Sequence, residues 1–573
     1  MPYWDWATNE PEFVPQIALN RDYREEGPKS SESITEKGIE DYNTLSEFKF
    51  PKGTPGNITA SAPISLSRLS PFRRIQILEH GIYDSFAHLS IFKQGTQDSG
   101  KDILRGIGGL RSTPSRFLEN LAQVPVERNL TERTVWILQK YNTYIAMSNN
   151  ALREVSDFKK MQDAENYGSL EDIHNAVHTL VGGGGHMSGI DVSAFDPIFW
   201  LHHTNIDRLF AIWQALHQDD SKPETSILAR PSGKNFSRDE NDVEGIQTPL
   251  YPFRSSEKQN HWYNSKTVER TDKFGYSYPE NATFTNSPNE AQKKFLREDL
   301  RKTLDKIYPR PSGLIGQNQP ASKAAGEELL PRAHILKQIT KKEIPATVEN
   351  LESLVQALPS REELLQTSLQ PSKPVLKDLA PEGKYLEWLA NIRAEKHTLD
   401  GAYSVHVFLG PPQEQNTFLW PSAPTHVNTF APLGQPSDTG CDKCQADQRD
   451  RIRVTGQIPL TIALIERYLA GIIDDLSEQS VIPYLKEHLH WRVVQGDGTI
   501  LPNRSDVAGL LVFVVSNEVT LPADEGEFPI YAPTVQVHPS ITTNLQGGGR
   551  GDGTGLTHEN APASSGQARN VVE

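Results

Sequence analysis

The sequence has little cysteine, no long apolar run and no excess of basic residues. Its 573 residues include two cysteines, Cys441 and Cys444, which are too few for a disulfide framework and favour a reducing compartment. No stretch reaches the roughly 18 consecutive apolar residues of a membrane span, and the first residues do not resemble a secretory signal. The formal net charge of -15 argues against nucleic acid, because phosphate binding needs clustered Lys and Arg. We therefore expect a soluble, cytoplasmic protein without nucleic-acid or membrane partners.

The apolar content is sufficient for more than one buried core. Hydrophobic residues make up 36% of the chain and aromatic residues 8%, and the length allows two or three domains. Residues 1–288 contain helical patterns, as in Glu132 to Ser156, where apolar residues recur at helical spacing. This pattern predicts a mainly helical first domain.

The composition changes twice after that domain. Residues 289–374 are rich in Lys, Glu, Gln and Pro, with an amphipathic pattern from Glu290 to Ile307, and predict a linker with short helices. Residues 375–545 contain strand-like runs, such as Tyr403 to Leu409 and Leu510 to Val515, and predict a β-rich domain. Residues 546–573 are rich in Gly, Ser and Asn, which predicts a disordered tail.

Three histidines have the spacing of a metal site. His174 and His178 are four residues apart, so on a helix they lie on one face, one turn apart. His203 follows an aromatic stretch and shares a helix face with apolar residues, so its ring is expected to be buried and to need a partner. Three neutral imidazoles without a thiolate or carboxylate suit copper or zinc and leave one coordination position open.

The same block carries a family resemblance. Residues 171–214, with His174, His178 and the pair His202-His203, are similar to the second copper motif of fungal tyrosinases, which belong to the type-3 copper proteins. In that family each of two copper ions is held by three histidines. The resemblance implies His174, His178 and His203 as the ligands of one copper ion, with His202 as a neighbour that shapes the pocket.

The resemblance also implies roles for residues around the ligands. Glu171 and Asn175 would form a pair that orients a water molecule and helps to deprotonate a phenol, with Glu165 as a rival for the acidic role. A helix N-terminal acid is the simpler explanation of Glu171. Ile190 corresponds to an aliphatic gate over the pocket, although an ordinary core isoleucine fits it equally well, and Phe199 would line the pocket.

Further matches extend over most of the chain. Residues 385–410 resemble the start of the fungal C-terminal lid domain, and Cys441 and Cys444 form a CxxC motif within it. The family suggests that this motif delivers copper, with a copper chaperone as a partner, whereas an inert pair of thiols is the plainer alternative. Phe430 would be either a plug over the site or local core. The fold expected from the resemblance is a mainly α catalytic domain, a partial four-helix bundle, followed by a β-rich lid.

The first copper motif of the family has no counterpart that we recognise. Pro2 to Ala7 resembles the segment that follows that motif, and its histidines would therefore precede residue 1. His80 and His88 are the nearest candidates, but they come after this segment and lack a third histidine. We therefore expect an N-terminally incomplete chain with one of the family's two copper sites.

Several functions remain open on this basis. The resemblance implies an oxidase that uses O2 to hydroxylate monophenols and to oxidise o-diphenols to o-quinones, as in melanin formation. An inactive fragment, a catechol oxidase, a non-catalytic copper-binding remnant and an oxygen-binding, haemocyanin-like protein are alternatives. Small phenols and O2 are the expected partners, and a homo-oligomer is compatible with the sequence.

Overall fold

The computed structural model describes residues 3–7, two short strands at 91–93 and 103–105, and most of the chain from 128 to 549. Within that last part the larger gaps cover 151–166, 218–225, 228–243, 282–289, 317–328, 343–349 and 365–375, and shorter gaps interrupt several loops. His80, His88 and Glu165 lie outside the described residues.

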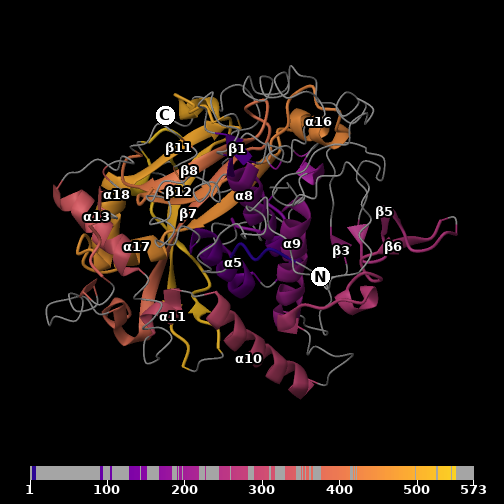
Figure 1. Ribbon diagram of the computed structural model, residues 1–573, viewed down its shortest axis with the longest axis horizontal. Coiled ribbons are helices and arrows are strands. Elements are labelled where there is room, and N and C mark those ends of the chain that lie inside the picture. The colour runs from indigo at the N-terminus through magenta and orange to yellow at the C-terminus, as the bar shows by residue number, and fades with distance from the viewer. Residues whose placement is uncertain are drawn as a thin grey trace, which may run out of the picture.

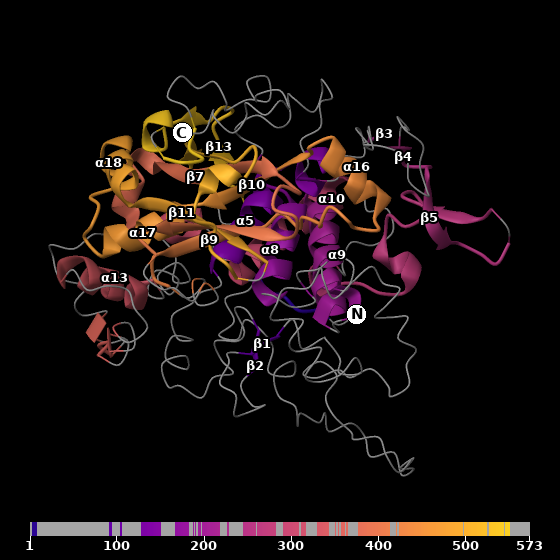
Figure 2. The ribbon, with the colours of Figure 1, turned by 90° about the horizontal axis from the view of Figure 1, so that it is seen from above.

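Helices dominate the first half of the described chain. They are α5 (Arg128–Lys140), α6 (Tyr144–Ser148), α8 (Leu170–Gly182) and α9 (Ile198–His217). Short strand pairs accompany them: β1 (Ile91–Lys93) with β2 (Ile103–Arg105), β3 (Ser226–Ile227) with β4 (Glu244–Gly245), and β5 (Pro249–Arg254) with β6 (Trp262–Asn264). The β5–β6 ribbon projects away from the helices (Figure 2).

Antiparallel sheets dominate the second half, as the sequence predicts. One sheet has the order β10-β7-β12-β13, with β14 also paired to β12, and a second has the order β11-β8-β9. The bounds are β7 (Lys384–Glu395), β8 (Tyr403–Leu409), β9 (His426–Phe430), β10 (Arg453–Pro459), β11 (Leu489–Gln495), β12 (Leu511–Thr520), β13 (Ile530–Tyr531) and β14 (Gln536–Val537). Helices α16 (Asp442–Arg449), α17 (Thr461–Leu469) and α18 (Glu478–His488) connect these strands.

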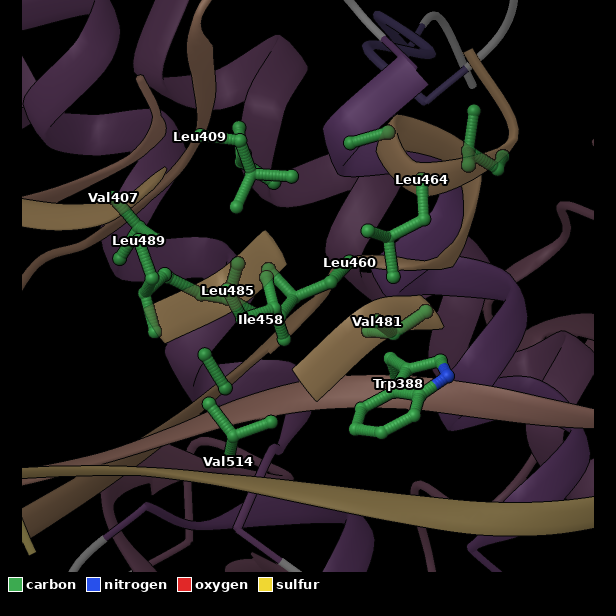
Figure 3. Packing of buried hydrophobic residues seen from close by; sticks show 14 of the residues in the cluster. Trp388, Val407, Leu409, Ile458, Leu460, Leu464, Val481, Leu485, Leu489 and Val514 are labelled. Carbon is green, nitrogen blue, oxygen red and sulfur yellow. The ribbon is translucent and has the colours of Figure 1, made fainter. Parts of the chain in front are cut away.

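The two larger sheets share a core. Alternate residues of β7 and β12, such as Trp388 and Val514, pack with Val407 and Leu409 of β8 and with Leu485 of α18 (Figure 3). Successive side chains of a strand point to opposite faces, so this core uses one face of each strand. The result is a sandwich whose interior is closed by α17 and α18.

The opposite face of the larger sheet packs on the helices. Leu389 of β7 and Leu511, Phe513 and Val515 of β12 belong to the same core cluster as the apolar residues of α5, α8 and α9. Figure 1 shows these helices beside the sheet. Because both faces of β12 are buried, its sequence is a continuous apolar run from Leu511 to Val515 instead of an alternating one.

A buried ion pair joins the helices to the sandwich. Arg133 of α5 lies 2.6 Å from a carboxylate oxygen of Asp172 of α8, and both side chains are almost fully buried. The guanidinium also donates to the side-chain oxygen of Asn428 (3.0 Å) and to the carbonyl of Thr429 (2.9 Å), and Asp172 accepts from the backbone N–H of Gln457 (3.2 Å). The β-rich part of the chain therefore supplies hydrogen-bond partners to both members of this ion pair.

The helices predicted in the linker are present and packed. Helix α10 spans Glu290–Ile307, as its amphipathic pattern predicts, and buries Leu300 and Leu304 in the helical core. Helix α11 (Pro311–Ile315) joins the sandwich core, and α13 (Leu330–Lys342) packs beside α17, where Arg332 pairs with Glu466 (3.2 Å). The segment thus contacts both halves of the protein.

The structure adds detail at two places that the sequence pattern left open. The helical pattern that begins near Glu132 forms two helices, because α5 ends at Lys140 and α6 starts anew where Thr143 accepts a hydrogen bond from the N–H of Ala146. Near the predicted start of the tail, at about residue 546, the carbonyl of Gly547 accepts from the N–H of Val512 of β12 and the N–H of Gly549 donates to the carbonyl of Val512; the disordered tail itself stays a prediction. Gly547 has a φ of 75°, and a side chain on Gly548 would collide with the carbonyl of Thr542, so the glycines there build a tight turn.

Within the described part of the chain, no helix combines the length and apolarity needed to cross a membrane.

Candidate metal centre

Helix α8 places two of the candidate ligands side by side. The side chain of Ser169 accepts a hydrogen bond from the N–H of Asp172 (3.0 Å), which caps the first turn of the helix. His174 and His178 follow one turn apart, and their ring centroids are 4.6 Å apart. The prediction that His174 and His178 lie side by side on one helix face is therefore confirmed.

Helix α9 brings the third candidate to the same place. The His203 ring lies 5.0 Å from that of His174 and 5.2 Å from that of His178, centroid to centroid. Its neighbour His202 is fully buried, and its ring is 5.1 Å from that of His174. One candidate ligand atom from each of the four histidines lies within 4.8 Å of all the others. Among the described residues, this is the cluster of His, Cys, Asp and Glu that could hold a metal ion.

Hydrogen bonds at Nδ1 fix the tautomers of three of these rings. The Nδ1 of His178 is 2.7 Å from the carbonyl of Met187, and that of His203 is 2.8 Å from the carbonyl of Phe199. The Nδ1 of His174 is 2.8 Å from the side-chain oxygen of Asn175. An oxygen acceptor at Nδ1 requires the proton there, so each Nε2 keeps its lone pair.

The donor set fits a metal ion. The Nε2 atoms of His174 and His203 are 3.0 Å apart, yet both are acceptors once Nδ1 carries the proton. Two lone pairs at this distance repel each other, and a cation between them turns the repulsion into ligation. Two nitrogens bound to one ion at about 2.0 Å each are about 3 Å apart. Imidazole ligands suit copper and zinc.

Desolvation keeps these imidazoles neutral, although His203, which the sequence pattern predicted to be buried, is only half-buried, as is His174. Desolvation lowers the pKa of His174 to about 4, and that of His203 to about 4 with a further contribution from His174. Desolvation also lowers the pKa of His178 well below its usual value, with smaller contributions from His174 and His203. Since a metal binds the unprotonated ring, the site is ready for an ion throughout the neutral range. Lys396, which follows β7, also contributes to the low pKa of His174, so the β-rich region reaches toward this site.

Glu171 and Asn175 each have a defined partner. Asn175 is buried, and its oxygen is the hydrogen-bond partner of His174. Glu171, in the first turn of α8, accepts a hydrogen bond from the backbone N–H of Asn150 (3.1 Å). In these positions Asn175 orients a ligand ring and Glu171 closes the loop after α6. The water-orienting pair implied by the resemblance stays a prediction.

The other residues predicted to line or cover the pocket have different positions in the structure. Phe199 lies against the site, with its ring centroid 3.8 Å from that of His203. Ile190 is 45% exposed, so it is not a core residue, and its role as a gate stays a prediction. Phe430 belongs to the sandwich core, against Gly456 of β10, as the local-core interpretation predicted.

The two cysteines form a disulfide between Cys441 and Cys444 at the start of α16. The expectation of a pair of thiols was wrong for this structure, because a three-residue separation brings the two sulfurs within bonding reach on one helical turn. A disulfide sulfur is not a thiolate ligand, so copper delivery by this motif would require its reduction.

Sequence reasoning missed one residue of the site. Trp6 is buried, and its indole N–H donates to Nδ1 of His202 over 3.0 Å. The two residues are 196 positions apart, so no local pattern pairs them. The dense aromatic character of residues 3–6 was the available signal.

Comparisons with known proteins agree with the geometry. Residues 1–216 match the model of the common central domain of tyrosinase, and residues 387–514 match that of the tyrosinase C-terminal domain. The fold and site thus define a protein in which a helical region carrying a buried imidazole centre precedes a β-rich region. The chain belongs to the tyrosinase family.

The chain aligns with only part of the length of each individual relative. A tyrosinase of Neurospora crassa is 34% identical over 415 residues, which are 66% of this chain and 59% of the relative. A tyrosinase of Podospora anserina is 36% identical over 315 residues, 52% of this chain and 50% of the relative. The chain thus spans about half to three fifths of these relatives. A solved structure of a recombinant mushroom tyrosinase aligns at 20% identity with a TM-score of 0.47, over 74% of this chain and 64% of that one.

Proposed function

We propose that this protein is a copper oxidase that uses O2 to oxidise phenols, hydroxylating monophenols and converting o-diphenols to o-quinones. The observation that carries the proposal is the convergence of three histidines, each with a ligand nitrogen within 4.8 Å of the others and each with its Nδ1 anchored to an oxygen. Family membership favours copper over zinc, which the same ligands would also suit. Copper supplies the electron transfer that reaction with O2 requires.

His174, His178 and His203 are the proposed copper ligands. Their Nδ1–H groups are held by Asn175 and by two backbone carbonyls, which fixes the plane of each ring before the ion arrives. We propose one ion in this cluster, and assign the second ion of the family to histidines beyond those described here. The chain's own contribution is therefore a set of three neutral donors whose rings are held by hydrogen bonds, with the ring of Phe199 packed at a tilt against His203.

The surroundings favour an apolar aromatic substrate. Phe199 covers His203, and the Trp200 side chain beside it is 61% exposed. Aromatic side chains near an open coordination position favour flat phenolic rings over charged or highly solvated molecules. Glu171 and Asn175 remain candidates for assisting phenol deprotonation, and substitution of each would test that role.

The decisive experiment measures copper and oxygen consumption together. The full chain is loaded with copper, copper per chain is determined, and O2 uptake is followed with a catechol and with the matching monophenol. The proposal predicts uptake that scales with bound copper and disappears in His178→Ala. Two bound copper ions per chain without any phenol-dependent uptake would overturn the oxidase assignment and favour a non-catalytic copper-binding protein, whereas one ion without uptake would favour the inactive-fragment alternative.

A further inference from the structure

His202 differs from the three neighbouring histidines in the direction of its hydrogen bond. Its Nδ1 faces the indole N–H of Trp6 at 3.0 Å, whereas the Nδ1 atoms of the other three rings face oxygen acceptors. An indole nitrogen can only donate, so Nδ1 of His202 must be unprotonated. A neutral His202 then carries its proton on Nε2, the opposite tautomer from its neighbours.

The alternative ring orientation is unfavourable. Turning the His202 ring by 180° would place a carbon where Nδ1 accepts from Trp6, leaving a buried indole N–H unpaired. Trp6 cannot readily move with a rotated His202 ring, because the residues before and after it in the chain are held by their own contacts. Asp5 is ion-paired with Arg208 (2.9 Å), and the carbonyl of Ala7 accepts a hydrogen bond from Thr131.

The proton on Nε2 has no acceptor. The Nε2 atom of His202 is buried and lacks a hydrogen-bond partner among the residues that the structure describes. The ring lies 4.8 to 5.1 Å, centroid to centroid, from the rings of His174, His178 and His203. A buried N–H without an acceptor is costly, and a ligand atom that accepts from it would recover that cost.

We propose that His202 is a hydrogen-bond donor to a small ligand bound beside the metal ion, and that Trp6 is the positioning residue that fixes it in the donor tautomer. The same hydrogen bond keeps His202 from being a fourth metal ligand, because its Nδ1 is occupied and its Nε2 carries a proton. Trp6 thereby distinguishes two adjacent histidines, one that binds the ion and one that contacts what the ion binds. The donor role rests on the proposed copper site, whereas the tautomer does not.

The tautomer is tested in the metal-free full chain. Nitrogen-15 NMR of the protein labelled at its histidine rings separates protonated from unprotonated nitrogens, and the His202 signals are those missing in His202→Phe. We expect an unprotonated Nδ1 and a protonated Nε2. In Trp6→Phe, which keeps a buried ring but removes the donor, the two nitrogens should shift toward a mixture of tautomers. A protonated Nδ1 in the wild type, or no change in Trp6→Phe, would overturn the assignment.

The donor role is tested with azide as the small ligand. Azide is titrated into the copper-loaded wild type and His202→Phe, and its charge-transfer absorption gives the dissociation constant. Loss of one hydrogen bond should weaken azide by about 3- to 10-fold while copper per chain stays unchanged. Equal azide affinity would refute the donor role, and loss of copper from His202→Phe would make His202 a ligand instead. Circular dichroism confirms that each variant is folded.

The two proposals fail differently. A chain that binds no copper would refute the proposed function, and the donor role of His202 would fall with it. The NMR result would still decide the tautomer, since that measurement uses no metal. A chain that binds copper and oxidises phenols with a protonated Nδ1 on His202 would leave the proposed function intact and refute the role of Trp6.

Discussion

Two groups of neighbouring histidines lie in the described part of the chain, and they use their nitrogens in opposite ways. In the metal centre, each of three rings gives one nitrogen to an oxygen acceptor and leaves the other free. In the sandwich, His406 of β8 and His426 of β9 face each other at 3.2 Å, and we call these two residues the sheet pair. The hydroxyls of Ser404 and Thr429 lie within 3.0 to 3.2 Å of the same rings.

A lowered pKa does not distinguish the two groups, although the sheet pair is buried and His174 and His203 are only half-buried. Desolvation lowers the pKa of His406 to about 3 and that of His174 to about 4, so both are neutral at neutral pH. The two groups differ in the hydrogen-bond partners of the ring nitrogens. In the sheet pair, hydroxyls and the other ring occupy both nitrogens of His406 and Nε2 of His426. Only Nδ1 of His426 lacks a partner among the described residues, so no convergent set of lone pairs is left for an ion. The comparison teaches that a metal centre is recognised by convergent unused acceptors, and that a low histidine pKa is insufficient evidence.

The largest expected effect separates the two groups by metal binding. In His178→Ala one of three ligands is lost, and we expect copper affinity to fall by more than about 100-fold, since loss of an outer partner of a ligand alone costs about 10- to 100-fold. The matched control is His406→Ala, which removes a comparably buried histidine. Competition with a coloured chelator measures both affinities. Similar losses in the two variants would contradict the distinction.

A smaller effect on copper should come from Asn175. In Asn175→Leu the acceptor for Nδ1 of His174 is lost, so the ring is no longer held in one tautomer and orientation. We expect copper affinity to fall by about 10- to 100-fold. Asn175→Asp keeps an oxygen acceptor and should retain most of the affinity in the same titration. If both variants behaved alike, the acceptor at this position would be irrelevant.

The sheet pair should matter for stability instead of metal binding. In His406→Leu the hydroxyls of Ser404 and Thr429 lose a buried partner. We expect the free energy of unfolding to fall by about 1 to 3 kcal/mol, measured by urea denaturation. His406→Gln keeps polar atoms in place and should cost less. An unchanged unfolding free energy in His406→Leu would show that the hydroxyls find other partners.

The smallest effect is a difference in acid sensitivity. Free histidine has a pKa near 6.5, whereas the pKa of His174 is about 4 in the folded metal-free chain, so between these values the unfolded state binds more protons. Stability should therefore fall as pH falls through this window, by at most about 1.4 kcal/mol per pH unit for each such histidine. Copper should reduce the contribution of His174, because protons must then displace the ion. Copper should not affect the contribution of His406 to the pH dependence of stability. In the copper-loaded chain, His406→Gln should therefore reduce the slope of unfolding free energy against pH that remains.

Local sequence patterns predicted the helix that carries His174 and His178, and several elements away from the site. The spacing of His174 and His178 is a property of one helix, and the strand over Tyr403–Leu409 and the helix over Glu290–Ile307 occur where their patterns place them. Each of these depends on residues within a few turns of one another. A periodicity in the sequence is sufficient to identify them.

Contacts between distant segments were beyond the sequence. Nothing local predicts that Trp6 meets His202, or that Met187 supplies the carbonyl for His178, because these depend on how the helices and loops pack. The residues at the start of the predicted tail are a similar case. Glycine-rich composition predicts disorder from about residue 546, yet Gly547 and Gly549 hydrogen-bond to the backbone of Val512 in β12.

The ion pair of Arg133 and Asp172 couples the stability of the histidine-bearing helix α8 to that of the sandwich. Separating the sandwich from the helices would remove the contacts of Asn428 of β9 and Gln457 of β10 and leave two charges poorly solvated in the gap. Helices α5 and α8 should therefore open together with the sandwich, as one cooperative unit in hydrogen exchange. The metal centre would then gain its persistence from a region that contributes no candidate ligand to it.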